Sequence, residues 1–186
     1  MNSFKFGHLT GEGLDVEYHY PDVYDWERTT GPARLVIAPR SGHLDLLRDL
    51  AACWKEPSWV LYVLAIPRGD GEGGRYQCPE PLDGAALEDF LVTHRDFLEG
   101  DGRHALWVAS ADGEGTVVYD RHNVLYAYGP LEAFEDVLTK RGLHRGPVEF
   151  PLPHTHHYHD FHDASEARLL QAFDWIYSPL REGDDD

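Results

Sequence analysis

The apolar run WVLYVLAI, from Trp59 to Ile66, limits the possible folds more than any other stretch of the sequence. It is far shorter than the roughly 20 residues that a membrane-spanning helix requires. It is also rich in residues that favour strands, and its length suits a strand better than a helix. We therefore expect a central strand here, covered on both faces by other parts of the chain.

Helical patterns lie on both sides of this run. After a β-rich segment, Ala33–Arg40, apolar residues recur at helical spacing, with Ser41 as a plausible N-cap: Leu44, Leu47, Ala51 and Trp54. A second helix is expected in residues 85–100, with one buried face formed by Leu87, Phe90, Leu91, His94 and Leu98. We interpret His94 there as a core histidine. The intervening residues 68–84 are rich in Gly and Pro, which predicts a loop.

The second half of the chain predicts more strands and two more helices. Three β-rich runs, 104–110, 115–120 and 123–129, are separated by the turn sequences ADGEG and RHN and indicate an antiparallel meander. A helix follows from Pro130 to its C-cap at Gly142. Residues 146–153 are expected to add an edge strand. A final helix begins at a capping box formed by Asp163 and Glu166, buries residues as far as Ile176, and ends at Pro179.

This order of elements predicts an α/β or α+β fold. We expect a single-domain sandwich in which about four helices pack on a mixed sheet that includes the three-stranded meander. The domain covers residues 1–180, and residues 181–186 form a disordered acidic tail. Residues 1–32 are polar and aromatic, and no element is assigned to them.

Charge and cysteine content exclude several classes of protein. The chain has 33 acidic and 16 basic residues and a net charge of −17. Because nucleic acids and anionic membranes repel such a surface, we expect neither as a partner, whereas a basic protein would be attracted. Solubility alone would also explain the acidity. The absence of an apolar leader at the start of the sequence predicts a soluble cytoplasmic protein. Two cysteines without a C-x-x-C motif exclude a disulfide scaffold.

The segment PHTHHYHDFHD, from Pro153 to Asp163, holds five of the 12 histidines. Imidazole is a common ligand of divalent transition metals such as zinc. In an extended backbone alternate side chains share a face, so His154 would pair with His156, and His157 with His159. Either pair could chelate a metal ion as H-x-H. A helical backbone would instead pair His159 with His156 or with His162.

Further ligands would come from nearby acids or from other turns. The candidates are Asp160, His162, His122, Asp120 and His104. The spacing matches no zinc motif, because H-E-x-x-H is absent and the acid of H-x-H-x-D-H is misplaced. A metal-free alternative therefore stays open, in which the run is an exposed connector whose histidines pack on aromatic rings.

Two classes of function follow. The first is a non-enzymatic binding protein or inhibitor for a basic partner, similar to a bacterial immunity protein. Its anchors would be Tyr18, Tyr20, Tyr24 and Trp26, although these rings could equally cover one side of the sheet. The second is a metal-dependent hydrolase that uses the histidine run. The sequence slightly favours the first class because no enzyme motif is present. It indicates neither the partner, the substrate nor the oligomeric state.

Overall fold

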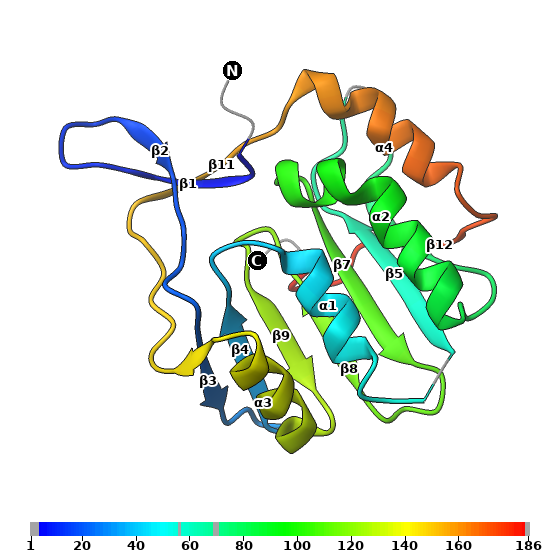
Figure 1. Ribbon diagram of the computed structural model, residues 1–186. Helices are drawn as coiled ribbons and strands as arrows, with labels where there is room; N and C mark the ends of the chain where they lie inside the picture. Colours follow the sequence, from blue (N-terminus) through cyan, green and yellow to red (C-terminus); the bar gives the residue numbers. More distant parts are fainter. Residues whose placement is uncertain (1–3, 56, 69–70, 185–186) are drawn as a thin grey trace.

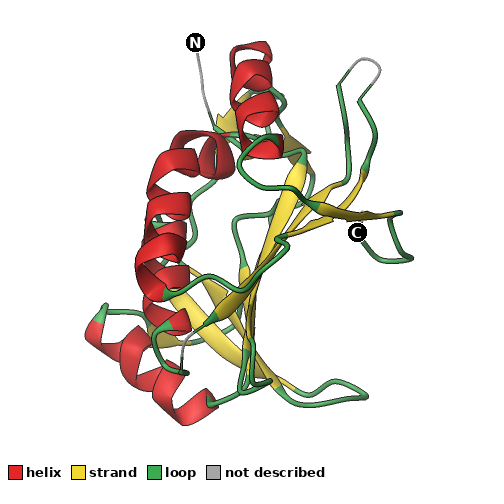
Figure 2. Ribbon diagram, turned by 90° about the vertical axis from the view of Figure 1, so that its right-hand side faces the viewer, coloured by secondary structure: helices red, strands yellow, loops and turns green. Residues whose placement is uncertain are grey.

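The computed structural model describes residues 4–55, 57–68 and 71–184, in which nine strands form one mixed sheet and four α-helices lie on one side of it (Figures 1 and 2). The spatial order of the strands is β10-β3-β4-β9-β8-β7-β5-β6-β12. Neighbouring strands are antiparallel except β10 and β3, which are parallel. The bounds are β3 Val23–Glu27, β4 Arg34–Ala38, β5 Ser58–Leu64, β6 Gly74–Gln77, β7 His104–Ser110, β8 Thr116–Tyr119, β9 Leu125–Tyr128, β10 His144–Arg145 and β12 Ile176–Ser178.

The main core lies between the helices and the meander β7-β8-β9. Along these strands, every second side chain points toward the helices and is fully buried, as Leu106, Val117 and Leu125 illustrate. The helix α1 packs on all three strands. The helices are α1 His43–Ala51, α2 Gly84–Gly100, α3 Leu131–Lys140 and α4 Asp163–Leu170, the last preceded by the 3₁₀ turn η1 Asp160–His162. The predicted α+β fold, the mixed sheet and the meander are confirmed.

A separate three-stranded sheet stands beside the large one, in the order β11-β1-β2 (Figure 1). It joins the two ends of the chain, because β1 Phe6–Leu9 and β2 Asp15–Glu17 pair with β11 His154–His156. Phe6 also contributes to a second, smaller core with Tyr20, Val23, Ala38 and Val124. Neither the small sheet nor the second core was predicted from the sequence.

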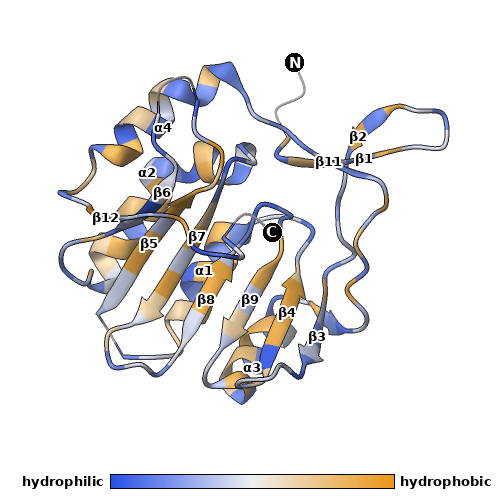
Figure 3. Ribbon diagram, turned by 180° about the vertical axis from the view of Figure 1, so that it is seen from behind, coloured by the Kyte–Doolittle hydropathy of each residue, from blue (hydrophilic) through white to orange (hydrophobic). Residues whose placement is uncertain are grey.

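The strand predicted at Trp59–Ile66 is present as β5, but its two faces differ. Val60 and Tyr62 are fully buried on the helix side, whereas Trp59 and Leu61 are only half-buried. Val63 on that second face is buried at 1% exposure, so the expected cover on both faces is present only in part, because the helices lie on one side of the sheet alone (Figure 2). Figure 3 shows the opposite face, where the strands β4, β9, β8 and β7 are not covered by a helix.

Several predicted boundaries are wrong. The loop predicted at 68–84 contains β6, and residues 146–153 do not form a strand. The last helix ends at Leu170, so Ile176 lies instead in β12 and is 54% exposed. Pro179 therefore follows a strand rather than ending a helix.

Two predicted helix caps are also wrong, the first for a local reason and the second because of a tertiary contact. The first helix begins after Gly42, whose left-handed backbone (φ 68°) ends the preceding turn, and Ser41 is not the cap. The capping box of Asp163 and Glu166 is absent, because both carboxylates bind the guanidinium of Arg103 instead.

The end of the described chain folds back on the sheet. Residues 181–184 of the predicted disordered tail are described, and Asp184 accepts a hydrogen bond from Arg75 at 2.5 Å. The rest of that tail, residues 185–186, lies outside the described residues. Cys53 and Cys78 are both free thiols. Within the described ranges, no helix combines the length and the apolar character needed to cross a bilayer.

Candidate metal centre

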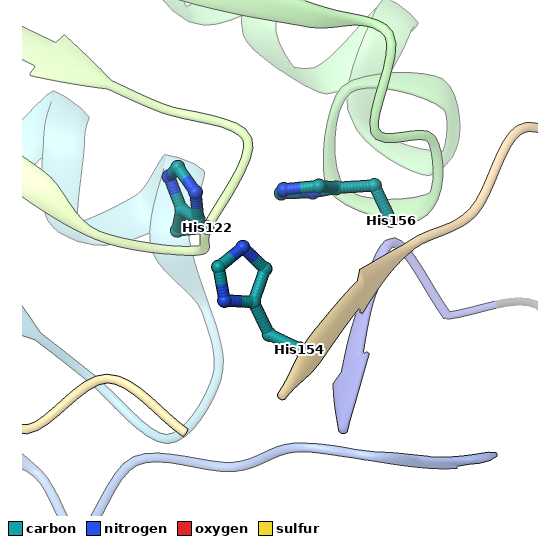
Figure 4. A group of neighbouring side chains, drawn as sticks. All are labelled: His122, His154 and His156. Atoms are coloured by element: carbon teal, nitrogen blue, oxygen red, sulfur yellow. The ribbon is translucent and has the colours of Figure 1, made fainter. Parts of the chain in front are cut away.

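Three histidines from distant parts of the sequence converge between the two sheets (Figure 4). His154 and His156 come from β11, and His122 comes from the turn between β8 and β9. One ring nitrogen of each lies within 4.8 Å of the corresponding nitrogens of the other two. The ring centroids are 4.7 Å apart for His122 and His156, and 5.3 Å apart for the other two pairs. The three imidazoles therefore surround one point in space.

Backbone hydrogen bonds fix the two β11 histidines. In the small sheet, His156 lies opposite Phe6 and His154 opposite His8, so both side chains are on the same face. Downstream, the His157 carbonyl accepts a hydrogen bond from the Gly102 N–H (2.8 Å), and the His157 N–H donates to the Lys5 carbonyl (3.0 Å). The extended H-x-H geometry predicted for this pair is thus imposed by β1 and by the turn at Gly102.

The third histidine is held by its own turn. Asp120 accepts hydrogen bonds from the backbone N–H groups of His122 and Val124, both at 2.9 Å, and thereby closes the loop between β8 and β9. Its second carboxylate oxygen lies 2.8 Å from Nδ1 of His122. A proton on Nδ1 would satisfy this contact, and Nε2 would then be the nitrogen that faces a metal ion.

The surroundings of the cluster keep its nitrogens available. The ring of Phe6, which is fully buried, contacts all three imidazoles at centroid distances of 5.6 Å. Nδ1 of His154 and both nitrogens of His156 are buried without a hydrogen-bond partner among the described residues. Burial, assisted by the neighbouring His122, lowers the pKa of His156 to about 3. His156 is therefore neutral at physiological pH, the form that binds metals.

The other predicted H-x-H pair follows β11 and makes its contacts away from the cluster. Nε2 of His157 is 3.0 Å from Asp15, and Nε2 of His159 is 3.0 Å from the backbone carbonyl of Phe4. Their rings are stacked with centroids 6.2 Å apart. The structure therefore separates the four predicted ligands into two pairs, and only His154 and His156 meet a third histidine.

The remaining candidate ligands lie outside the cluster. Asp160 is exposed and pairs with Arg68. His162 is buried against Phe97, and His104 is fully buried with Nε2 3.3 Å from the carbonyl of Leu98. Burial lowers the pKa of both His162 and His104. Of the five additional residues, His122 joins the cluster and Asp120 supports it.

A cavity of about 460 Å³ opens beside His122 on the helix-free face of the large sheet. Asp120 and His122, from the turn between β8 and β9, line one end of it, and the ring of Phe150 lies beside His122. Trp107 and Tyr126 lie on its floor. This cavity was not predicted from the sequence, although the alternating pattern of β7 and β9 places Trp107 and Tyr126 on the face opposite the core.

The four aromatic residues proposed as partner anchors have different environments. Tyr20 and Tyr24 are buried, at 1% and 6% exposure, and Tyr20 belongs to the second core. Trp26 is 36% exposed and donates a hydrogen bond from its ring N–H to Glu135 at 2.9 Å. Tyr18 packs against the rings of Phe6 and Tyr20. In this conformation Tyr20 and Tyr24 are not accessible to a partner.

Comparisons with known proteins leave the geometry as the only guide to function: neither a scan against protein-family models nor searches of curated proteins and of solved structures found a match.

Proposed function

We propose that the protein is a metal-dependent hydrolase that binds a divalent transition metal ion, such as zinc, through His122, His154 and His156. The observation that carries the proposal is the convergence of these three imidazoles, with nitrogens within 4.8 Å of one another. Zinc–nitrogen bonds of about 2.0–2.1 Å place tetrahedral ligands about 3.4 Å apart, so small side-chain rotations would close the site.

The donor set suits catalysis better than a purely structural role. Structural zinc sites are closed by four protein ligands, whereas catalytic sites combine three protein ligands with water. Three histidine ligands correspond to the second arrangement, in which a bound ion would lower the pKa of a water molecule and supply a nucleophile near neutral pH. The adjacent cavity at His122 would give a substrate access to that position.

The protein's own residues have distinct roles in this proposal. Asp120 orients His122 through the 2.8 Å contact with Nδ1 and is a positioning residue. Phe6 excludes water from the side of the cluster that faces the small core. Phe150 lines the cavity with its ring centroid 5.5 Å from that of His122, so a substrate beside the metal centre would contact it.

Metal analysis of untagged protein tests the site. We expect one equivalent of zinc after loading and gel filtration, and loss of it in the His154→Ala/His156→Ala double variant. A matched control, His19→Ala/His144→Ala, removes two histidines that lie outside the cluster and should keep full stoichiometry. The variant His157→Gln/His159→Gln should also keep it, because that pair faces the other way. Undiminished zinc in the His154/His156 variant would refute the site.

Catalysis needs a separate measurement. We expect hydrolysis of at least one member of a panel of chromogenic carboxylic and phosphoric esters by the zinc-loaded protein. The activity should disappear with chelator and return with zinc. Stoichiometric metal without hydrolysis of any panel member would contradict the hydrolase class while leaving the metal site intact.

The net charge of −17 supports a second candidate, an acidic binding protein or inhibitor for a basic partner. Association with such a partner would be steered by long-range attraction and would slow with salt, since the Debye length falls to about 8 Å at 0.15 M. Stopped-flow association with a purified basic partner between about 0.05 and 0.5 M salt measures this. An on-rate that does not change over that range would rule out electrostatic steering, and the acidity would then serve solubility.

A further inference from the structure

The cavity beside His122 has a second end of different chemistry. Its floor continues from Tyr126 to Tyr128 along β9, and Arg34 of the neighbouring strand β4 lies at that end. These side chains belong to the helix-free face, because the residues between them, such as Ala127, are buried under the helices. The cavity thus runs along β9, with a guanidinium at one end and Asp120 and His122 at the other.

The guanidinium of Arg34 is held in place by three contacts. Its Nε donates to Glu27 at 2.5 Å, and its Nη1 donates to the hydroxyl of Tyr128 at 2.7 Å. Its planar group lies over the ring of Tyr126, 4.3 Å from the centroid. Within the described part of the chain, Nη2 has no hydrogen-bond partner, and the Tyr128 hydroxyl keeps its own proton. Two donors are therefore held by a fixed framework, which favours binding of an anionic group such as a carboxylate or a phosphate.

Glu27 pairs with Arg34 through Nε but does not line the cavity, and the two acidic residues that do line it are engaged elsewhere. Asp120 is already engaged by His122 and by two backbone N–H groups. Asp184 enters the cavity from the C-terminal segment and is held by Arg75, whose guanidinium lies 5.4 Å from the ring centroid of Trp107. The carboxylate of Asp184 is thus neutralised by Arg75 beside Trp107.

We propose that this cavity binds a ligand with a flat apolar body and a terminal anionic group, a carboxylate or a phosphate, with the anion at Arg34 and the other end at His122. The rings of Trp107 and Tyr126 would contact the flat body. The separation of the two ends follows from the strand rise: four residues from Tyr128 to Val124 span roughly 14 Å. A volume of about 460 Å³ is in the range of small-molecule sites.

This inference rests on the proposed function, because it treats the cavity as the substrate side of the metal centre. Its test nevertheless uses metal-free protein, so that the two ideas can fail separately. The probes share one flat body and differ in the end group: biphenyl-4-carboxylate, biphenyl-4-yl phosphate and the neutral biphenyl-4-carboxamide. Titration calorimetry measures the dissociation constant of each. We expect at least one of the two anions to bind wild-type protein ten-fold or more tightly than the carboxamide does.

The variant Arg34→Met keeps an unbranched apolar side chain over Tyr126 but removes the charge. We expect it to bind the anions no more tightly than the carboxamide. The control Arg145→Met, which removes an exposed guanidinium paired with Asp25, should bind them like wild type. A ten-fold preference for the carboxylate probe or for the phosphate probe identifies which of the two anionic groups the site accepts. Equal binding of all three probes by wild type, no binding of any probe, or unchanged anion binding in folded Arg34→Met would overturn the inference.

The wild-type comparison needs no substitution, so a folding defect in Arg34→Met, checked by circular dichroism, does not remove the test. Zinc stoichiometry is measured on the same preparations. If wild-type protein binds stoichiometric zinc but does not prefer the anionic probes, the ligand class alone would be overturned. Anion selectivity without zinc binding would overturn the metal centre alone.

Discussion

Nδ1 of His122 lies 2.8 Å from a carboxylate oxygen of Asp120, inside a turn that the same carboxylate closes through two backbone N–H groups. A carboxylate that accepts the second ring proton of a histidine sets the tautomer and the orientation of the ring. Asp120 therefore links the fold of the β8–β9 turn to the direction in which His122 presents Nε2.

This relationship predicts a loss of zinc affinity in Asp120→Asn. The amide would keep the size of the side chain but would bind Nδ1 more weakly and would not fix the tautomer. We expect zinc affinity to fall about 10–100-fold, measured by competition with a chromogenic chelator. The control Asp112→Asn changes an exposed acid in the neighbouring β7–β8 turn and should leave the affinity unchanged. An unaltered zinc affinity in Asp120→Asn would show that Asp120 supports the turn only.

Local sequence patterns predicted the parts of the fold whose partners are close in the chain. The meander follows from alternation and from two tight turns, and its strands pair with their sequence neighbours. The small sheet could not be predicted in this way, because β1 pairs with β11 from the other end of the chain. The predicted last helix was too long for a related reason. The residues after Leu170 include β12, which pairs with β6, and the glycine-rich surroundings of β6 predicted a loop instead of a strand.

In the candidate site, too, the local pattern was predicted and the contacts between distant residues were not. Period-2 alternation predicted that His154 and His156 share a face, but it predicted the same for His157 and His159. Only the placement of β11 decides between the pairs, since one face meets His122 and the other meets Asp15. Arg34 could not be related to the site from the sequence, because strand pairing between β4 and β9 brings it to the cavity.

Arg103 is expected to stabilise both the domain and the histidine run. Its fully buried guanidinium binds Asp101, Glu166 and Asp163, and it donates to the His159 carbonyl at 3.1 Å. Asp101 in turn accepts from the His159 N–H at 2.9 Å. Burial alone would raise the pKa of Asp101, but the contacts with Arg103 and the His159 N–H outweigh it and lower the pKa.

The substitution Arg103→Met would leave two carboxylates buried without their cation. We expect the free energy of unfolding to fall by about 3–5 kcal/mol, measured by urea denaturation. Arg145→Met, which breaks an exposed ion pair with Asp25, is the matched control and should cost no more than about 1 kcal/mol. Equal effects of the two substitutions would show that the buried network contributes no more than a surface pair.

Lys5 gives the fold a defined dependence on pH. Lys5 is 1% exposed, and its Nζ lies 3.8 Å from the ring centroid of Tyr119 and donates to the Leu98 carbonyl at 3.4 Å. Burial lowers the pKa of Lys5 to about 7, although Asp120 and Glu99 act in the opposite direction. Between about pH 7 and pH 10.5 the unfolded chain therefore holds a proton that the folded protein has released.

Because the unfolded state binds more protons in that window, the contribution of Lys5 to stability rises with pH, by up to about 1.4 kcal/mol for each pH unit. Lys5→Met removes the buried amine. The free energy of unfolding of this variant should exceed that of wild type most near pH 7 and below, where burial of the charged amine costs most. The difference should shrink toward pH 9.5. Urea denaturation of both proteins at pH 6.5, 7.5, 8.5 and 9.5 measures the difference. Lys140→Met, at an exposed position of α3, should show no such trend. A Lys5→Met difference that stays constant over this range would mean that the buried amine keeps its ordinary pKa, and that the contacts with Tyr119 and Leu98 compensate the cost of its burial.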